Sequence, residues 1–286
     1  MRFACSIHPS VLKHSRTKVH NTLYEKDEDK YSDTYAKTDA QTLGEVGQFR
    51  KIAPEIKTAD DLLNNYKALT VVLGAYNLGS LQNSRALVKA LMTQDPTSDT
   101  SVAAKSKNPT WIAFAKDFSA WQGTSSSTSA ADQPFGTADK ISAIITKFQK
   151  NQFEDSLNED DSGVGNALYF TRTMTDSMNL TNIMGDTKLL KVVETVSGFD
   201  PTTFGALSYD QQVRMLSKVV KTSDFSTPEK IKQYAERYLA MLQINPQPSS
   251  KPATMLSLYG ADGSSNSILS LFGDSSGSSS LVSALF

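Results

Sequence analysis

The chain has 286 residues, and its 29 Lys and Arg against 30 Asp and Glu give a net charge of -1. With 39% hydrophobic residues, 21% charged residues and a mean hydropathy of -0.34, the composition excludes a wholly disordered polyelectrolyte and a membrane-embedded protein. The balanced charge gives no electrostatic reason to expect nucleic acid or an anionic membrane as a partner. No apolar run approaches the ~18 residues of a membrane span, and residues 1–20 lack the apolar stretch of a secretory signal.

Histidine and cysteine are confined to the N-terminus. His8, His14 and His20 are the only histidines, and Cys5 is the only cysteine, so no intrachain disulfide can form. The rest of the chain therefore lacks the groups for Ser-His-Asp, Cys-His or zinc chemistry, and no nucleotide-binding, GxSxG or EF-hand motif is present. We predict no catalytic residue, no cofactor and no metal. The alternative is one zinc ion bound by these four side chains together.

Residues 1–46 are predicted to be a flexible arm. Residues 24–39 hold nine charged side chains in sixteen positions and few aliphatic ones. Burial of such a segment cannot offset its loss of conformational entropy.

Residues 47–122 show the apolar spacing of a first helical repeat. Thr58 and Asp61 form a capping box at the start of a predicted helix that runs to Tyr76. Asn108 followed by Pro109 is a typical helix start, because proline at the first helical position loses no hydrogen bond. The aromatic residues that follow are predicted to be core, with a ligand pocket as the alternative; they are Trp111, Phe114, Phe118 and Trp121.

Residues 123–136 read as a Ser/Thr/Ala-rich linker, and residues 137–244 as bridging helices and a second repeat. One bridging helix is predicted from Thr137, and a helix capped by Ser162 runs towards Met174. The acidic residues 158–161 lack the spaced ligands of an EF-hand, so we predict a solvated loop there and keep calcium as the alternative. The second repeat has helix starts at Thr181, at Ser208 with Gln211, and at Thr227 with Pro228, and Gly198 is predicted to end its first helix in the left-handed conformation.

The two repeats align with one another at a constant spacing of 121 positions. Seven similar pairs carry the alignment: Phe49 and Phe170, Leu63 and Met184, Lys67 and Lys188, Leu69 and Leu190, Val71 and Val192, Val72 and Val193, Leu78 and Phe199. The prolines of the third helices, Pro109 and Pro228, match at a spacing of 119. We therefore predict an all-α protein made of a duplicated module of about three helices per copy plus connecting helices, a two-lobed helical bundle.

Residues 245–286 form a Ser/Gly-rich tail that contains a recurring apolar motif. The motif begins at Met255 and recurs thirteen residues later at Ile268 and, more loosely, at Leu281. One interpretation is that these clusters cover the protein's own surface. The other hypothesis is that they dock into a groove of a partner protein. The candidate docking residues are Met255, Leu256, Leu258, Tyr259, Ile268, Leu269, Leu271, Phe272, Leu281, Val282, Leu285 and Phe286.

Several segments resemble an uncharacterised, all-helical bacterial family, found chiefly in alphaproteobacteria. The segments are Phe49-Arg50, residues 60–69, residues 73–78, residues 148–154 and residues 166–170, and the resemblance covers about residues 47–242. The sequence departs from the family after the second helix, where a longer acidic stretch is usual. The resemblance implies a link to flagellar basal-body genes and no catalytic residues.

Three function classes follow, and the first is our prediction. It is a non-enzymatic structural or interaction protein, associated with the flagellum, with a protein partner that includes flagellar components. The second is a cytoplasmic chaperone or adaptor that binds amphipathic helices of a client. The third is an enzyme that uses a lysine or the carboxylates Glu154, Asp155 and Glu159. We expect a bacterial protein without a Sec signal, either cytoplasmic or flagellum-associated, and the sequence sets no oligomeric state.

Overall fold

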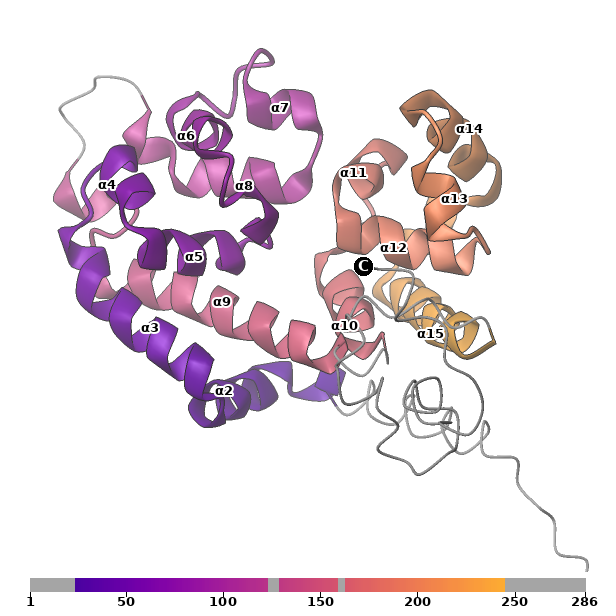
Figure 1. Cartoon of the computed structure of the whole chain (residues 1–286). Coiled ribbons are helices and arrows are strands. Elements are labelled where there is room, and N and C mark those ends of the chain that lie inside the picture. The colour runs from indigo at the N-terminus through magenta and orange to yellow at the C-terminus, as the bar shows by residue number, and fades with distance from the viewer. Residues whose placement is uncertain (1–23, 123–128, 159–162, 245–286) are drawn as a thin grey trace, which may run out of the picture. The chain divides into compact units, whose positions relative to one another are not determined.

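A computed structural model describes residues 24–122, 129–158 and 163–244 (Figure 1). Every regular element within these ranges is an α-helix or a short 3-10 helix, and no strand occurs in them. The prediction of an all-α protein is confirmed. None of the helices in the described part combines the length and apolar character that a membrane crossing requires.

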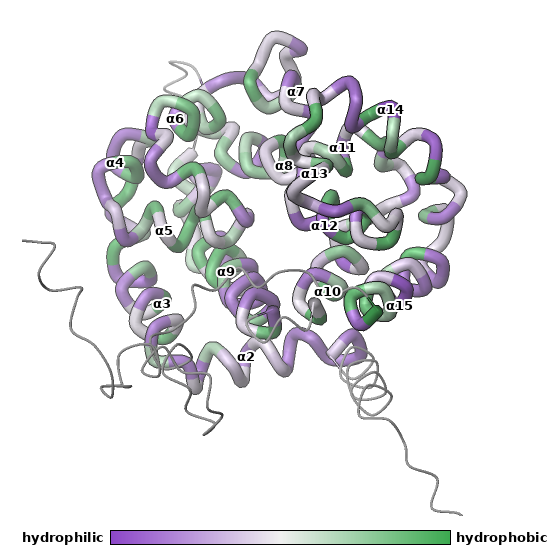
Figure 2. The backbone as a smooth tube through the Cα atoms, turned by 45° about the vertical axis from the view of Figure 1, so that its right-hand side comes forward, coloured by the Kyte–Doolittle hydropathy of each residue, from purple (hydrophilic) through white to green (hydrophobic). Residues whose placement is uncertain are grey.

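The N-terminal region differs from its prediction as a flexible arm. Its described part contains α2 (Glu28–Thr38) and α3 (Ala40–Ile52), which are joined at Asp39. Figure 2 shows that α2 is mostly hydrophilic, yet its small residues Ser32 and Ala36 are buried where it packs on α9. The arm prediction is wrong from residue 24 onward because tyrosines and small residues supply the contacts that aliphatic residues were expected to supply. Residues 1–23 lie outside the described residues.

The first hydrophobic core is built around α5 (Tyr66–Ala75). The 0% exposed side chains Val71, Val72 and Leu73 lie at its centre. Phe114 and Phe118 belong to this core, and the two tryptophans 111 and 121 pack against it, as predicted. The other elements of this region are η1 (Ala53–Glu55), α4 (Ala59–Asn64), η2 (Gly79–Leu81), α6 (Arg85–Thr93), α7 (Val102–Ser106), α8 (Pro109–Asp117) and η3 (Ser119–Trp121).

Helix α9 (Ala138–Asn158) contributes to both cores. Its residues Ile141, Ile144, Ile145 and Phe148 belong to the first core, and Phe153 belongs to the second. The predicted bridging helix is thereby confirmed. The preceding segment holds η4 (Ala130–Asp132) and Phe135, which is buried in the first core, so this part of the predicted linker is packed. Residues 123–128 lie outside the described residues.

The second hydrophobic core is formed mainly by α10, α12 and α15, which pack on one another. Gly198 has the predicted left-handed conformation, with φ of 74°, and the capping box of Ser208 and Gln211 is present. The predicted cap at Ser162 and the acidic residues 159–161 lie outside the described residues. The elements of this region are α10 (Val164–Thr173), α11 (Leu180–Gly185), α12 (Thr187–Val196), α13 (Pro201–Gly205), α14 (Tyr209–Val219), η5 (Thr222–Phe225) and α15 (Pro228–Ile244).

The predicted helix from Thr58 to Tyr76 is two helices. Thr58 and Asp61 form the expected capping box, but Asn65 interrupts the helix and accepts a hydrogen bond from the Ala68 amide at 3.0 Å, which starts α5. Asp186 interrupts the second repeat in the same way and starts α12. An N-cap side chain therefore overrides the continuous apolar spacing at both places.

Several local features recur 121 positions apart. Both bounds of α4 and α5 reappear at this spacing in α11 and α12, and α3 and α10 end at equivalent residues. Pro109 and Pro228 start α8 and α15, as predicted, but α8 has nine residues and packs on α6, whereas α15 has seventeen and packs on α10 and α12. Helix α9 packs on α5 as α15 packs on α12. Duplication of the whole module stays a prediction.

Candidate functional site

Most of the predicted site residues lie outside the part of the chain that the structure describes. The twelve docking residues of the tail, between Met255 and Phe286, lie outside the described residues, as do Cys5 and the three histidines. Within the described ranges, no three His, Cys, Asp or Glu side chains gather so that they could hold a metal ion.

The carboxylates considered for an enzyme do not converge. Glu154 is 0% exposed and lies inside the protein, whereas the Asp155 side chain is 53% exposed and pairs with Lys188, at 2.7 Å between Nζ and Oδ1. Glu159 lies outside the described residues. The neighbouring positions 154 and 155 thus serve different contacts on α9.

A buried polar cluster surrounds Glu154. Its Oε1 accepts hydrogen bonds from Arg172 on α10, at 3.0 Å from Nε and 2.7 Å from Nη2. Among the described residues, neither its Oε2 nor Oε1 of Glu28 on α2 has a hydrogen-bond partner, and both atoms are buried. The Glu28 carboxyl group lies next to that of Glu154, and its Oε1 is 4.0 Å from Nε of Arg172. Two buried carboxyl groups therefore share one guanidinium.

Arg172 also connects this cluster to the first core. Its Nη2 donates to Oδ1 of Asn151 at 3.1 Å, and the Asn151 amide donates to the carbonyls of Gly74 and Ala75 at the end of α5, both at 2.9 Å. The Gly74 carbonyl also accepts from the Asn77 amide at 3.1 Å, so the Asn151 side chain adds to the hydrogen bonds that end α5. Helices α9 and α10 approach closely here, because a Cβ on Gly165 would overlap the backbone carbonyl of Glu154.

Burial sets the charge state of the cluster. It raises the pKa of Glu154 to about 8, against the opposing effect of Arg172 and Lys188, and the neighbouring Glu28 raises it further. A carboxyl group with this pKa carries a proton through most of the neutral range, and it can then donate a hydrogen bond to a neighbouring carboxylate.

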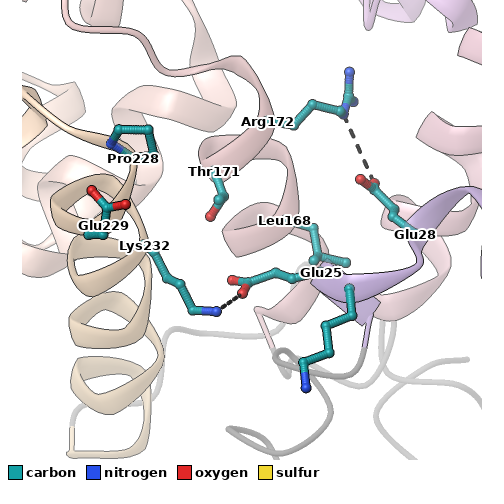
Figure 3. Close-up of a pocket in the computed structure, with 9 residues that line it drawn as sticks. Glu25, Glu28, Leu168, Thr171, Arg172, Pro228, Glu229 and Lys232 are labelled. Atoms are coloured by element: carbon teal, nitrogen blue, oxygen red, sulfur yellow. Dashed lines mark ion pairs between the residues drawn. The ribbon is translucent and has the colours of Figure 1, made fainter.

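A pocket of about 380 Å³ opens beside the cluster (Figure 3). It lies between the N-terminal segment, α10 and α15, and an ion pair of 2.6 Å between Oε2 of Glu25 and Nζ of Lys232 crosses it. Both signs of charge line it. The lining residues are Glu25, Lys26, Glu28, Leu168, Thr171, Arg172, Pro228, Glu229 and Lys232.

A second pocket, of about 270 Å³, lies beside the first core. Tyr76 donates to Oδ2 of Asp117 at 2.5 Å, and Lys147 donates to the same oxygen at 2.7 Å while its Nζ lies 4.4 Å from the centre of the Tyr76 ring. Burial, together with Asp117, raises the pKa of Tyr76 far above its ordinary value. The phenol therefore stays protonated, and the three side chains serve to join α5, α8 and α9.

Sequence reasoning missed two members of the buried cluster. Glu28 was assigned to the flexible arm, and Arg172 was not considered. Arg172 is the only charged residue of α10, and a single charge in an otherwise apolar helix is a signal that could have identified it.

The comparisons with known proteins agree with this all-helical architecture. The family described as "Protein of unknown function (DUF1217)" matches residues 75–231, more than half of the chain, so the chain belongs to it. A crystal structure of a protein from Agrobacterium tumefaciens is similar with a TM-score of 0.66 and 21% identity, over 82% of this chain and 96% of that chain. At this identity the likeness concerns the fold alone. No curated protein matched. The prediction of an uncharacterised bacterial family is confirmed.

Proposed function

We propose that this member of a family of unknown function is a non-enzymatic interaction protein associated with the bacterial flagellum. The resemblance described above supports the flagellar context, since it implies neighbourhood with flagellar basal-body genes. In this role the helical body is a scaffold, and the tail binds a component of the larger structure.

The recurring tail motif carries the proposal. Three apolar clusters begin at Met255, Ile268 and Leu281, spaced by thirteen residues and separated by Ser- and Gly-rich sequence. Several weak sites on one chain bind a multivalent partner more tightly than any one site does, because each bound site raises the effective concentration of the others. A repetitive assembly is a partner of this kind.

The geometry around Glu154 supports a non-enzymatic role. Its carboxyl group is 0% exposed and already bound by Arg172, so it would have to leave that contact to reach a substrate. Asp155 is likewise engaged with Lys188.

A co-purification experiment tests the proposal. A full-length variant with Tyr259→Ser, Phe272→Ser and Phe286→Ser loses one aromatic side chain per cluster, and Ser265→Ala with Ser278→Ala is the matched spacer control. We expect the spacer control to retain flagellar components from the native organism and the aromatic variant to lose them, with unchanged far-UV circular dichroism. Equal recovery by both variants would refute docking through the tail.

An adaptor that binds an amphipathic helix of a client is the second candidate, and α14 favours it. Tyr209 and Val219 on this helix are 54% and 48% exposed, and Met215, one turn before Val219, is partly buried. In the same experiment, recovery of a single client that is lost with Val219→Lys and kept by the aromatic tail variant would select this candidate.

A further inference from the structure

The contact of α2 with α9 and α10 contains more negative charge than it can neutralise. Glu28 of α2 and Glu154 of α9 both face Arg172 of α10. Lys188 of α12 is the other cation near Glu154, and it donates to Asp155 at 2.7 Å and to Asn77 at 2.7 Å. On the pocket side of Glu28, Lys232 pairs with Glu25, and the other charged lining residues are Lys26 and Glu229. Among the described residues, Arg172 is therefore the cation that both buried carboxyl groups share.

The shared proton is inferred from two buried carboxyl oxygens that lack hydrogen-bond donors. Oε1 of Glu28 and Oε2 of Glu154 are both buried, and each lacks a hydrogen-bond partner among the described residues. A buried acceptor without a donor is costly, but one proton placed between the two groups supplies the missing donor and leaves a single negative charge opposite Arg172. The docked arrangement is complete only in this singly protonated state.

We propose that Glu28 and Glu154 form a pH-dependent latch, which holds α2 on α9 and α10 while the two carboxyl groups share a proton and releases α2 when that proton is lost.

The position of Glu28 determines which element leaves. Its side chain is 14% exposed, whereas that of Glu154 is 0% exposed. After the proton is lost, Glu154 and Arg172 still form a complete ion pair inside the protein, and Glu28 is the surplus charge. Its departure removes the repulsion without opening the second core.

The other contacts of α2 have to open together with the carboxyl pair. Ser32 and Ala36 are buried against α9, whereas Tyr31 and Tyr35 are only partly buried, with the Tyr35 ring 6.0 Å from that of Phe153. Lys150 of α9 pairs with Asp29, whose side chain is 80% exposed. Asp39, an extended residue between α2 and α3, is a natural hinge. Release would uncover the α9 surface around Phe153.

The direction of the pH effect follows from proton linkage. In the docked state Glu28 is one of the groups that raise the pKa of Glu154 to about 8, so the pKa of Glu154 falls when α2 leaves, although Glu154 stays buried beside Arg172. The docked state therefore binds the proton more tightly, and its advantage is lost as the pH rises through neutrality to about 8. Between the pKa of Glu154 in the released state and about 8, each pH unit lowers the ratio of docked to released α2 by up to about tenfold.

Energy transfer between two dyes measures docking directly. Thr34 on α2 and Gln233 on α15 are exposed, so Thr34→Cys and Gln233→Cys in a Cys5→Ser chain place the dyes without touching the cluster. We expect efficient transfer at pH 6 and reduced transfer at pH 9, with far-UV circular dichroism that shows the body still folded.

Two variants and one control test whether the carboxyl pair causes the pH response of α2. Gln at position 154 or 28 supplies a permanent amide donor and removes one charge, so Glu154→Gln and Glu28→Gln should each keep α2 docked from pH 6 to pH 9. Glu194→Gln is the control, because Glu194 on α12 has a pKa raised to about 7 by burial yet is not part of the cluster; it should keep the wild-type response. The same transfer at pH 6 and pH 9 in the wild type, or a wild-type response in both cluster variants, would overturn the proposal.

Discussion

The two cores use similar helices but have different interiors. Within the described residues that pack around the first core, the buried polar side chains Thr42, Ser101 and Asn108 are uncharged. The second core region buries three carboxyl groups, those of Glu154, Asp186 and Glu194. The first interior therefore buries apolar and neutral polar groups, whereas the stability of the second also depends on protons and on one arginine.

Residues 121 positions apart make the comparison specific. Leu73 is fully buried, and Glu194 occupies the equivalent place in α12. Exposed Lys51 corresponds to Arg172, which is bound to Glu154. Such pairs allow the same kind of substitution to be made in both regions. A difference in its effect on stability then reports the surroundings of the residue and not the residue type.

Removal of the guanidinium should have the largest effect. Arg172→Met removes the guanidinium that Glu28 and Glu154 share, and we expect a loss of about 4 kcal/mol in the free energy of unfolding at pH 8. At pH 5 the loss should be smaller, because protonation relieves the repulsion. Chemical denaturation at the two pH values measures both.

Lys51→Met is the matched control for this prediction and should change stability by less than about 0.5 kcal/mol, since Lys51 is exposed. Addition of Glu154→Gln to Arg172→Met should recover part of the loss. If the arginine and lysine variants lose equal stability, the cluster contributes nothing specific.

A methyl group at the contact of α9 with α10 should have the next largest effect. A Cβ at Gly165 would overlap the Glu154 carbonyl, whereas the equivalent Gly44 in α3 has no atom within 4 Å of that position. We expect Gly165→Ala to cost about 3 kcal/mol and Gly44→Ala to stabilise by about 0.5–1 kcal/mol through helix propensity. Thermal unfolding of the two variants measures the difference, and destabilisation by both would argue against the open position of Gly44.

Much of the fold could be predicted because its signals are local. Capping pairs such as Thr58 with Asp61 act over three residues, and Gly198 needs only its own backbone freedom. The helix breaks at Asn65 and Asp186 were missed because the apolar spacing continues through both.

The buried cluster could not be predicted because its members are distant in the sequence. Glu28 and Glu154 belong to helices that meet only after the chain folds, and the charge around Glu28 resembles that of a solvated segment. The flagellar association and the tail contacts stay predictions, since they concern partners and residues outside the described ranges.

The pH dependence of stability tests the contrast between the interiors most directly. Burial raises the pKa of Glu154 to about 8 and that of Glu194 to about 7, so the folded state binds protons that the unfolded state has already lost, and stability should fall as the pH rises from 5 to 8. Chemical denaturation of the wild type and of the double variant Glu154→Gln/Glu194→Gln over this range measures that fall. At about 1.4 kcal/mol per pH unit for each group between its unfolded and folded pKa values, we predict that the wild type loses about 6 kcal/mol more than the double variant does. Equal slopes for the two proteins would contradict the account.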